Sequence, residues 1–284
     1  MSLIWVSHPW VQPPNSPNLL KSIEEQQIEF GKIDGLGSMS SCRLCGSKEG
    51  LTKEHSPSKS SVNKSKLITL SIAPIITRFL HWQGNIIQGG SKHESLCRNC
   101  NNKTGSWYNP TYVKFVRTCV SIANVNNAYK AVNISANNIY PSRLLKQALT
   151  HIIATCQPGL CVRYSDLKEI ILNKEKLLDI SPFKIGMFIR VNKGGRHSGI
   201  TIFVDTAKEQ ARLIAEFSFW PLGWVMTFDN SPLDGTLDVT NWSSISGNEK
   251  TNLNISVPCQ WCVSPYPGDF RSPDKVFERK RAGA

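Results

Sequence analysis

The sequence has no hydrophobic run long enough to cross a membrane. Its longest apolar stretch, residues 67–76, is ten residues long and contains Ser71 and Pro74, whereas a transmembrane helix needs about 20 apolar residues. The N-terminus also lacks a basic region followed by an apolar segment and a small-residue cleavage site, so we expect no secretory signal. These absences predict a cytoplasmic protein without a membrane partner.

Acidic residues are scarce. Asp and Glu number 21 against 33 Lys and Arg, which gives a formal net charge of +12 and an isoelectric point near 9.3. Between residues 43 and 103, ten basic residues stand against three acidic ones. Concentrated positive charge favours a polyanionic partner, because neutralising phosphates releases counterions. A solvated, lysine-rich surface would explain the charge equally well, so charge alone does not decide.

Cysteines are present without an export signal, which indicates thiols or metal ligands and argues against a disulfide framework. Four of the nine form two Cys-x-x-Cys pairs, Cys42 with Cys45 and Cys97 with Cys100. Two such pairs supply the four sulfurs of a tetrahedral structural zinc site. A zinc ribbon leaves about 15 to 20 residues between its pairs, whereas residues 46–96 intervene here. We therefore expect further structure within this insert.

Other motifs stand in a fixed order around the two cysteine pairs. The first pair is followed by Glu54 and His55, with Pro57 two residues further on, and the second pair is followed directly by Asn101, Asn102 and Lys103. Over residues 40–110 this order resembles the HNH endonucleases, the ββα-metal nucleases, in their zinc-stapled form. The resemblance implies a treble-clef-like nuclease module with a structural zinc ion and a catalytic divalent metal.

The resemblance also implies roles for single residues. Glu54 and Asn101 would ligate the catalytic metal, and His55 would activate water as the general base. The middle motif residue, usually an Asn about five places before the third cysteine, departs from the family pattern. Lys92 occupies that offset and His93 follows it, so the residue that orients His55 stays open. Lys92, His93, Asn102 and Lys103 are accessory candidates.

These residue types suit phosphodiester hydrolysis. A divalent cation can neutralise the non-bridging oxygen and the departing oxygen of an anionic phosphate. The carboxylate of Glu54 and the amide carbonyl of Asn101 are hard oxygen donors of the kind that Mg²⁺ or Mn²⁺ prefers. The imidazole of His55 titrates near neutrality, and a general base of this kind contributes about 10²- to 10⁴-fold in rate.

The expected substrate is DNA, with 3′-hydroxyl and 5′-phosphate products implied by the resemblance. By analogy alone, a nuclease module joined to an unfamiliar domain resembles bacterial restriction or anti-phage defence effectors. The residues expected to contact the nucleic acid are basic and lie in or beside the motifs: Lys53, Lys59, Lys64, Lys66, Arg98 and Lys103.

We expect an α+β protein in three parts: an N-terminal arm (1–40), a nuclease domain with structural zinc (41–119) and a C-terminal α+β domain with an antiparallel sheet (120–284). In the nuclease domain we expect a strand over 51–55, a helix from 101 and a second helix after Pro110. In the C-terminal part, helices are expected over 143–156 and 166–178, and strands over 183–191, 199–205, 211–219, 223–228 and 252–257.

The C-terminal part could sense a signal, choose the target, form homo-oligomers or bind an activating partner. Its Cys259 and Cys262 make a third Cys-x-x-Cys pair without a visible partner pair.

Two other functions of the protein stay open. One is a zinc-dependent nucleic-acid-binding protein without catalysis, and the other is a regulatory protein that uses the C-terminal sheet as an interface.

Overall fold

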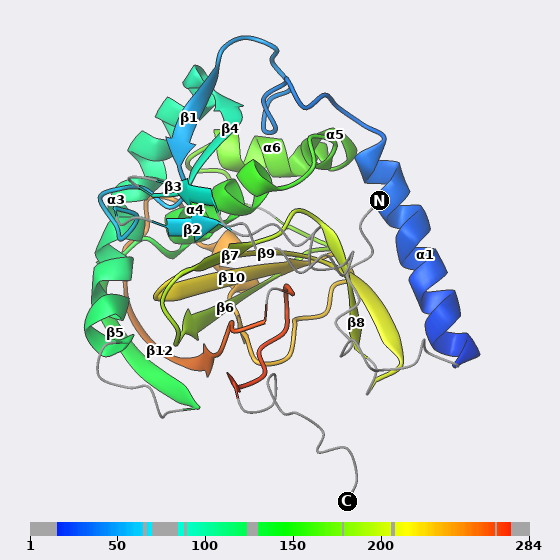
Figure 1. Cartoon of the computed structure of the whole chain (residues 1–284). Coiled ribbons are helices and arrows are strands. Elements are labelled where there is room, and N and C mark those ends of the chain that lie inside the picture. The colour runs from blue at the N-terminus through cyan, green and yellow to red at the C-terminus, as the bar shows by residue number, and fades with distance from the viewer. Residues whose placement is uncertain are drawn as a thin grey trace, which may run out of the picture.

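The computed structural model describes residues 16–64, 67–69, 85–87, 90–123, 130–177, 179–205, 208–264 and 266–273. Residues 1–15 of the expected N-terminal arm, the predicted DNA contact Lys66 and the last eleven residues lie outside this part of the chain. The structure has the mixed α+β character that the sequence predicts (Figure 1). Within the described residues, no helix is long and apolar enough to cross a membrane.

The first helix, α1 (Pro17–Asp34), packs on the C-terminal sheet. Pro17 stands in its first turn, where a missing N–H costs nothing. Leu19, Ile23 and Ile33 are buried. The Ser22 hydroxyl accepts a hydrogen bond from the Ala211 backbone N–H at 3.0 Å, which fixes the helix to a strand almost 190 residues further along.

An antiparallel hairpin and a long helix follow. Strand β1 (Leu51–His55) pairs with β4 (Lys92–Cys97), and α3 (Arg98–Ala123) begins directly after β4. The insert between β1 and β4 contains a short pair of strands, β2 (Leu67–Thr69) and β3 (Asn85–Ile87). Two strands and a helix therefore surround the cysteine motifs.

Helix α3 is continuous through Pro110, where the sequence predicts a break. A proline inside a helix removes one hydrogen bond, but the residues on both sides of Pro110 are buried, among them Tyr108, Tyr112 and Phe115. The hydroxyl of Tyr108 also donates to the Ile171 carbonyl at 2.7 Å. Burial of these aromatic side chains outweighs the lost hydrogen bond, so the helix continues.

The C-terminal region forms an eight-stranded sheet in the order β5-β12-β6-β10-β9-β7, with β8 also paired to β9 and β11 to β6. The pairs are antiparallel except β12 with β6, which are parallel. The strands are β5 (Ala131–Ile139), β6 (Lys184–Arg190), β7 (Gly195–His197), β8 (Thr201–Asp205), β9 (Gln210–Phe219), β10 (Leu222–Thr227), β11 (Leu237–Asp238) and β12 (Thr251–Gln260).

Helices cover one face of this sheet, as Figure 1 shows: α4 (Pro141–Thr155), α5 (Leu160–Arg163) and α6 (Ser165–Leu172). Helix α6 ends six residues before the predicted position 178. The side-chain oxygen of Asn173 accepts hydrogen bonds from the backbone N–H groups of Glu175 and Lys176, so a turn replaces the helix there. The 3₁₀ helix η1 (Thr240–Ser244) contacts α4. The other face carries a smaller core that contains Phe188, Val225 and Cys262.

One hydrophobic core runs from the cysteine motifs to the sheet. It contains Cys42 and Leu96 as well as Ile152 and Trp224. Helix α3 crosses position 119, the expected boundary between two domains, without interruption. The hairpin and the sheet thus share buried surface, and the division into domains stays a prediction.

His151 of α4 predicts an acid sensitivity of the fold. Its ring is 3% exposed and lies between Tyr112 and Phe217, with centroids 5.1 and 4.8 Å away. Burial lowers the pKa of His151 to about 3. Below pH 6.5 the unfolded chain therefore takes up a proton at this position that the folded protein does not, and stability falls by about 2 kcal/mol at pH 5.

We expect His151→Gln to lose less stability than the wild type between pH 7.5 and pH 5, measured as the free energy of urea unfolding at each pH. The variant will be less stable than the wild type at both pH values, so the quantity to compare is the change in unfolding free energy between pH 7.5 and pH 5. Equal losses in the two proteins would contradict the assignment.

Candidate metal centre

The four cysteines of the two pairs converge on one point. The sulfur atoms of Cys42, Cys45, Cys97 and Cys100 all lie within 4.8 Å of one another. The Cys45 and Cys97 sulfurs are 3.7 Å apart, far beyond a disulfide bond of about 2.05 Å. Four Zn–S bonds of about 2.3 Å in a tetrahedron place sulfurs about 3.8 Å apart. The geometry and the donor set therefore fit a structural zinc ion.

The backbone of the first pair is shaped to present its sulfurs. The Cys42 N–H donates to the Ser47 carbonyl at 2.7 Å, and the Gly46 N–H donates back to the Cys42 carbonyl at 2.7 Å. Gly46 has φ +77°, which favours glycine at this turn. A hydrogen bond from the Cys100 thiol lowers the pKa of Cys42, which favours the thiolate, the form that binds zinc.

Glu54 lies on the inner face of the hairpin. It is 8% exposed, and one of its carboxylate oxygens accepts a hydrogen bond from the Ser95 hydroxyl at 2.7 Å. Burial raises the pKa of Glu54 to about 7. The pairing register skips Ser95, which makes a bulge opposite Thr52 and Lys53 and directs the serine to the carboxylate.

His55 lies on the opposite face from Glu54, because successive side chains of a strand alternate. Its cross-strand partner is Lys92. Burial, together with repulsion from Lys59 and Lys92, lowers the pKa of His55, so its imidazole is neutral at pH 7. Within the described part of the chain, the buried Nδ1 atom has no hydrogen-bond partner. The ring can therefore accept a proton.

Asn101 stands in the first turn of α3, next to the last cysteine. Its amide nitrogen donates to the Thr52 hydroxyl at 3.0 Å. Thr52 lies two residues before Glu54, and such residues share one face of a strand about 7 Å apart. Asn101 and Glu54 are therefore on the same side of the hairpin, while Asn102 and Lys103 point into solvent.

The two candidates for the middle motif position have different neighbours. Lys92 is exposed and lies across from His55, whereas His93 lies across from Glu54. Burial lowers the pKa of His93 to about 4, and its Nε2 lies 3.2 Å from the Ser91 hydroxyl. Lys92 is therefore the cross-strand neighbour of His55, and His93 is the cross-strand neighbour of Glu54.

The predicted DNA contacts that the structure describes are all exposed: Lys53, Lys59, Lys64, Arg98 and Lys103. Lys53 pairs with Glu94 across the hairpin at 3.3 Å, and exposed pairs of this kind are worth little. Its ammonium therefore remains available to a phosphate at small cost.

Asn63 is a residue that the sequence reasoning missed. It is fully buried, and its amide donates to the carbonyls of Pro57 at 2.8 Å and Ser91 at 2.9 Å while its oxygen accepts the Ser91 N–H at 2.8 Å. Gly90 makes room for it, since a Cβ there would lie 2.1 Å from the Asn63 oxygen. Asn63 ties the loop after His55 to the residue before β4. One asparagine among serines and lysines gives no sequence signal for this.

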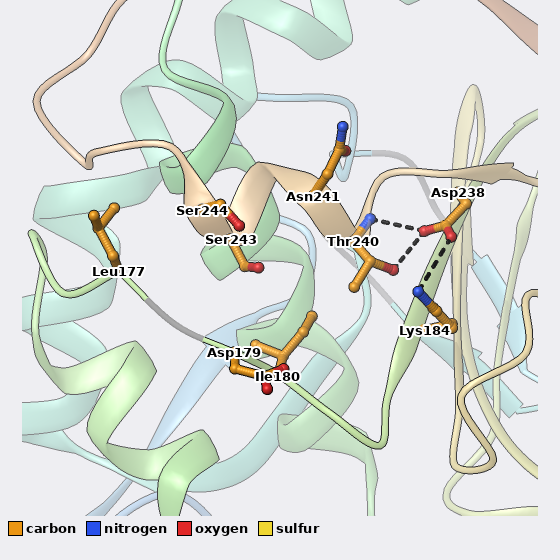
Figure 2. A pocket seen from close by; sticks show the side chains of 9 residues that line it. All are labelled: Leu177, Asp179, Ile180, Lys184, Asp238, Thr240, Asn241, Ser243 and Ser244. Carbon is orange, nitrogen blue, oxygen red and sulfur yellow. Dashed lines mark hydrogen bonds and ion pairs between the residues drawn. The ribbon is translucent and has the colours of Figure 1, made fainter.

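Two further features lie apart from the cysteine cluster. Cys262 of the third pair is buried, which raises the pKa of its thiol to about 11, and in the described residues the four-cysteine cluster is the one group of three or more ligand residues suited to a metal ion. A surface pocket of about 700 Å³ adjoins η1 (Figure 2). There Lys184 pairs with Asp238 at 3.8 Å, and Asp238 accepts from Thr240.

Comparison with protein-family models, curated proteins and solved structures found no match to this chain. The site is therefore interpreted from its own geometry.

We expect one zinc ion per chain in the purified protein. Cys97→Ser should remove most of it and unfold the hairpin, because the energy of metal binding is available only to the folded site. Cys259→Ser, in the half-buried third pair, should keep full zinc content. Zinc is measured by mass spectrometry of the metal and folding by circular dichroism. Wild-type protein without zinc, or Cys97→Ser with full zinc, would contradict the assignment.

Asn63→Ala should destabilise the protein by about 2 kcal/mol, because it removes the side-chain partner of the Ser91 N–H and of the Pro57 and Ser91 carbonyls. Hydrogen exchange should rise in residues 56–64 and at Ser91, next to the candidate site. Asn133→Ala, on the exposed side of β5, serves as the control and should change neither quantity. Unaltered exchange in the Asn63 variant would show that these hydrogen bonds do not fix the loop.

Proposed function

We propose that the protein is a metal-dependent HNH-type endonuclease that hydrolyses DNA phosphodiester bonds and leaves 3′-hydroxyl and 5′-phosphate ends. One observation carries the proposal. The cysteine cluster brings β1, with Glu54 and His55 at its end, beside the first turn of α3, with Asn101. The order of motifs in the sequence thus corresponds to a compact arrangement in space.

The oxygen donors support a catalytic cation. The Glu54 carboxylate and the Asn101 amide lie on one face of the hairpin, and they are the ligand types that Mg²⁺ and Mn²⁺ prefer. A bound cation would supply stabilisation of the charge that develops on the phosphate. The Asn101 amide nitrogen donates to Thr52, so its carbonyl oxygen is the atom left for a cation.

The general base in this proposal is His55. A base must be unprotonated before it can take a proton from water, and the lowered pKa of His55 keeps its ring neutral. Asn63 holds the loop that follows it. Exposed Lys59 and Lys64 on the same loop offer charge to the DNA backbone.

A second function, binding of nucleic acid without cleavage, is favoured by one specific observation. Glu54 is buried and hydrogen-bonded to Ser95, and strand alternation puts His55 on the other face. If the protein only binds nucleic acid, the cysteine cluster and the exposed lysines would be enough for binding. Neither Glu54 nor His55 would then contribute to DNA affinity.

Plasmid cleavage separates the two functions. We expect nicking or linearisation with Mg²⁺ or Mn²⁺ and none with EDTA. His55→Ala should reduce the rate at least about 100-fold, as expected for loss of a general base, while zinc content and DNA binding in a gel-shift assay stay unchanged. Glu54→Gln keeps the shape of the side chain and should fail in the same way.

The control is Lys168→Ala on α6, an exposed lysine outside the motifs, which should cleave like the wild type. The assay is repeated with protein expressed beside its genomic neighbours, so that an activator is supplied. Intact plasmid under every condition, with zinc and DNA still bound, would establish the binding function instead.

A further inference from the structure

The C-terminal sheet reaches the candidate site through one pair of rings. His93 of β4 and His197 of β7 meet edge to face, with centroids 4.8 Å apart and planes at 86°. The two residues are 104 positions apart, and β7 is the edge strand of the sheet next to β9. The contact therefore joins the hairpin to a different part of the fold.

The backbone on both sides of His197 is firmly held. Arg196 is buried and makes two 2.8 Å hydrogen bonds to the carboxylate of Glu216. The Ser198 N–H donates to the Glu216 carbonyl at 2.8 Å, and the Ser198 hydroxyl accepts the Glu216 N–H at 3.0 Å. Between these anchors His197 pairs with Phe217. The sheet thus presents the ring of His197 from a rigid support.

The ring of His197 lies where the edge of the sheet contacts the hairpin. The residue is exposed to solvent, yet surrounding protein lowers its pKa, with the cation of Arg43 acting in the same direction. The Arg43 guanidinium donates to the Ala154 carbonyl at the end of α4. The hairpin, α4 and the edge of the sheet therefore meet at His197.

His93 is held from two sides. Its Nε2 lies 3.2 Å from the Ser91 hydroxyl, and Ser91 is itself fixed by Asn63. On the other side its ring packs on His197. His93 lies directly across the hairpin from Glu54, and residues opposite each other on an antiparallel pair have side chains on the same face. A shift of His93 would therefore disturb the face that carries Glu54.

We propose that His197 is a positioning residue of the candidate nuclease site: its ring holds His93 across from Glu54, so that the hairpin is competent only while it is docked on the edge of the C-terminal sheet. The proposal rests on the proposed nuclease function and deepens it, because it assigns the sheet a part in the site.

The test compares His197→Ala with His197→Phe. Phe keeps a ring that can pack on His93 but has no N–H, whereas Ala removes the ring. We expect His197→Ala to lower kcat for plasmid cleavage about 10- to 100-fold with little change in KM, since small displacements in an active site cost up to about 100-fold. His197→Phe should retain most of the wild-type kcat. Adding His197→Ala to His93→Ala should lower the rate no further.

Hydrogen exchange of residues 90–97 gives a readout that does not need cleavage. Exchange should rise in His197→Ala and stay near the wild-type level in His197→Phe. Zinc content and melting temperature of both variants establish that they are folded. Lys193→Ala, an exposed change on the turn before β7, is the control and should leave exchange and cleavage unchanged.

Each outcome of these experiments bears on either the nuclease function or the positioning role of His197. A wild type that cannot cleave removes the nuclease function, whatever the exchange shows. An active wild type with unchanged kcat and exchange in His197→Ala overturns the positioning role alone. Equal losses in the Ala and Phe variants, with a raised KM, would mean that the imidazole binds substrate directly and would also overturn it.

Discussion

The structure around the candidate site depends on the convergence of four thiols from two distant segments. Cys97 ends β4 and Cys100 lies in the first turn of α3, so one cluster fixes both the end of the hairpin and the direction of the helix. Hydrogen bonds from the Arg43 N–H to Ser95 and from the Arg98 N–H to Gly50 add to this junction. A zinc ion would join these elements at a junction too small to have a hydrophobic core of its own.

The hairpin divides the motif residues between two faces. Glu54, His93 and the Ser95 bulge face the body of the protein, whereas His55 and Lys92 face the other way. Burial raises the pKa of the Glu54 carboxyl group to about 7, so a cation bound there under the proposed function would have to stabilise its ionised form. Under the proposed function, the neutral imidazole of His55 on the outer face would act on water beside the DNA backbone. In the proposed reaction, the substrate would have to reach both faces of the hairpin at the end of β1, where His55 is the last residue.

The four-cysteine cluster was predictable from spacing alone, because two Cys-x-x-Cys pairs have few other structural uses outside disulfide frameworks. Strands β6, β8, β9 and β10 lie close to the apolar runs that predicted them. Strand β5 was missed, although Val132, Ile134 and Ala136 alternate with polar residues. The bulge at Ser95 and the role of Asn63 could not be predicted, since pairing register and loop closure are set by contacts between segments distant in the sequence.

Helix α4 explains why the hairpin and the sheet form one structure. In its last turn, the Ala154 carbonyl accepts a hydrogen bond from the guanidinium of Arg43, the residue after the first cysteine of the cluster. In its first half, the Lys146 ammonium donates to the Asn173 carbonyl at 2.7 Å, in the loop after α6. His151 in the same helix stacks on Phe217, the pairing partner of His197. A ligand or partner that bound the sheet could alter the site only by binding more tightly to one position of the hairpin than to another. The contacts of α4 and His197 are the places where such a preference would act, because they are the junctions at which the hairpin and the sheet constrain each other.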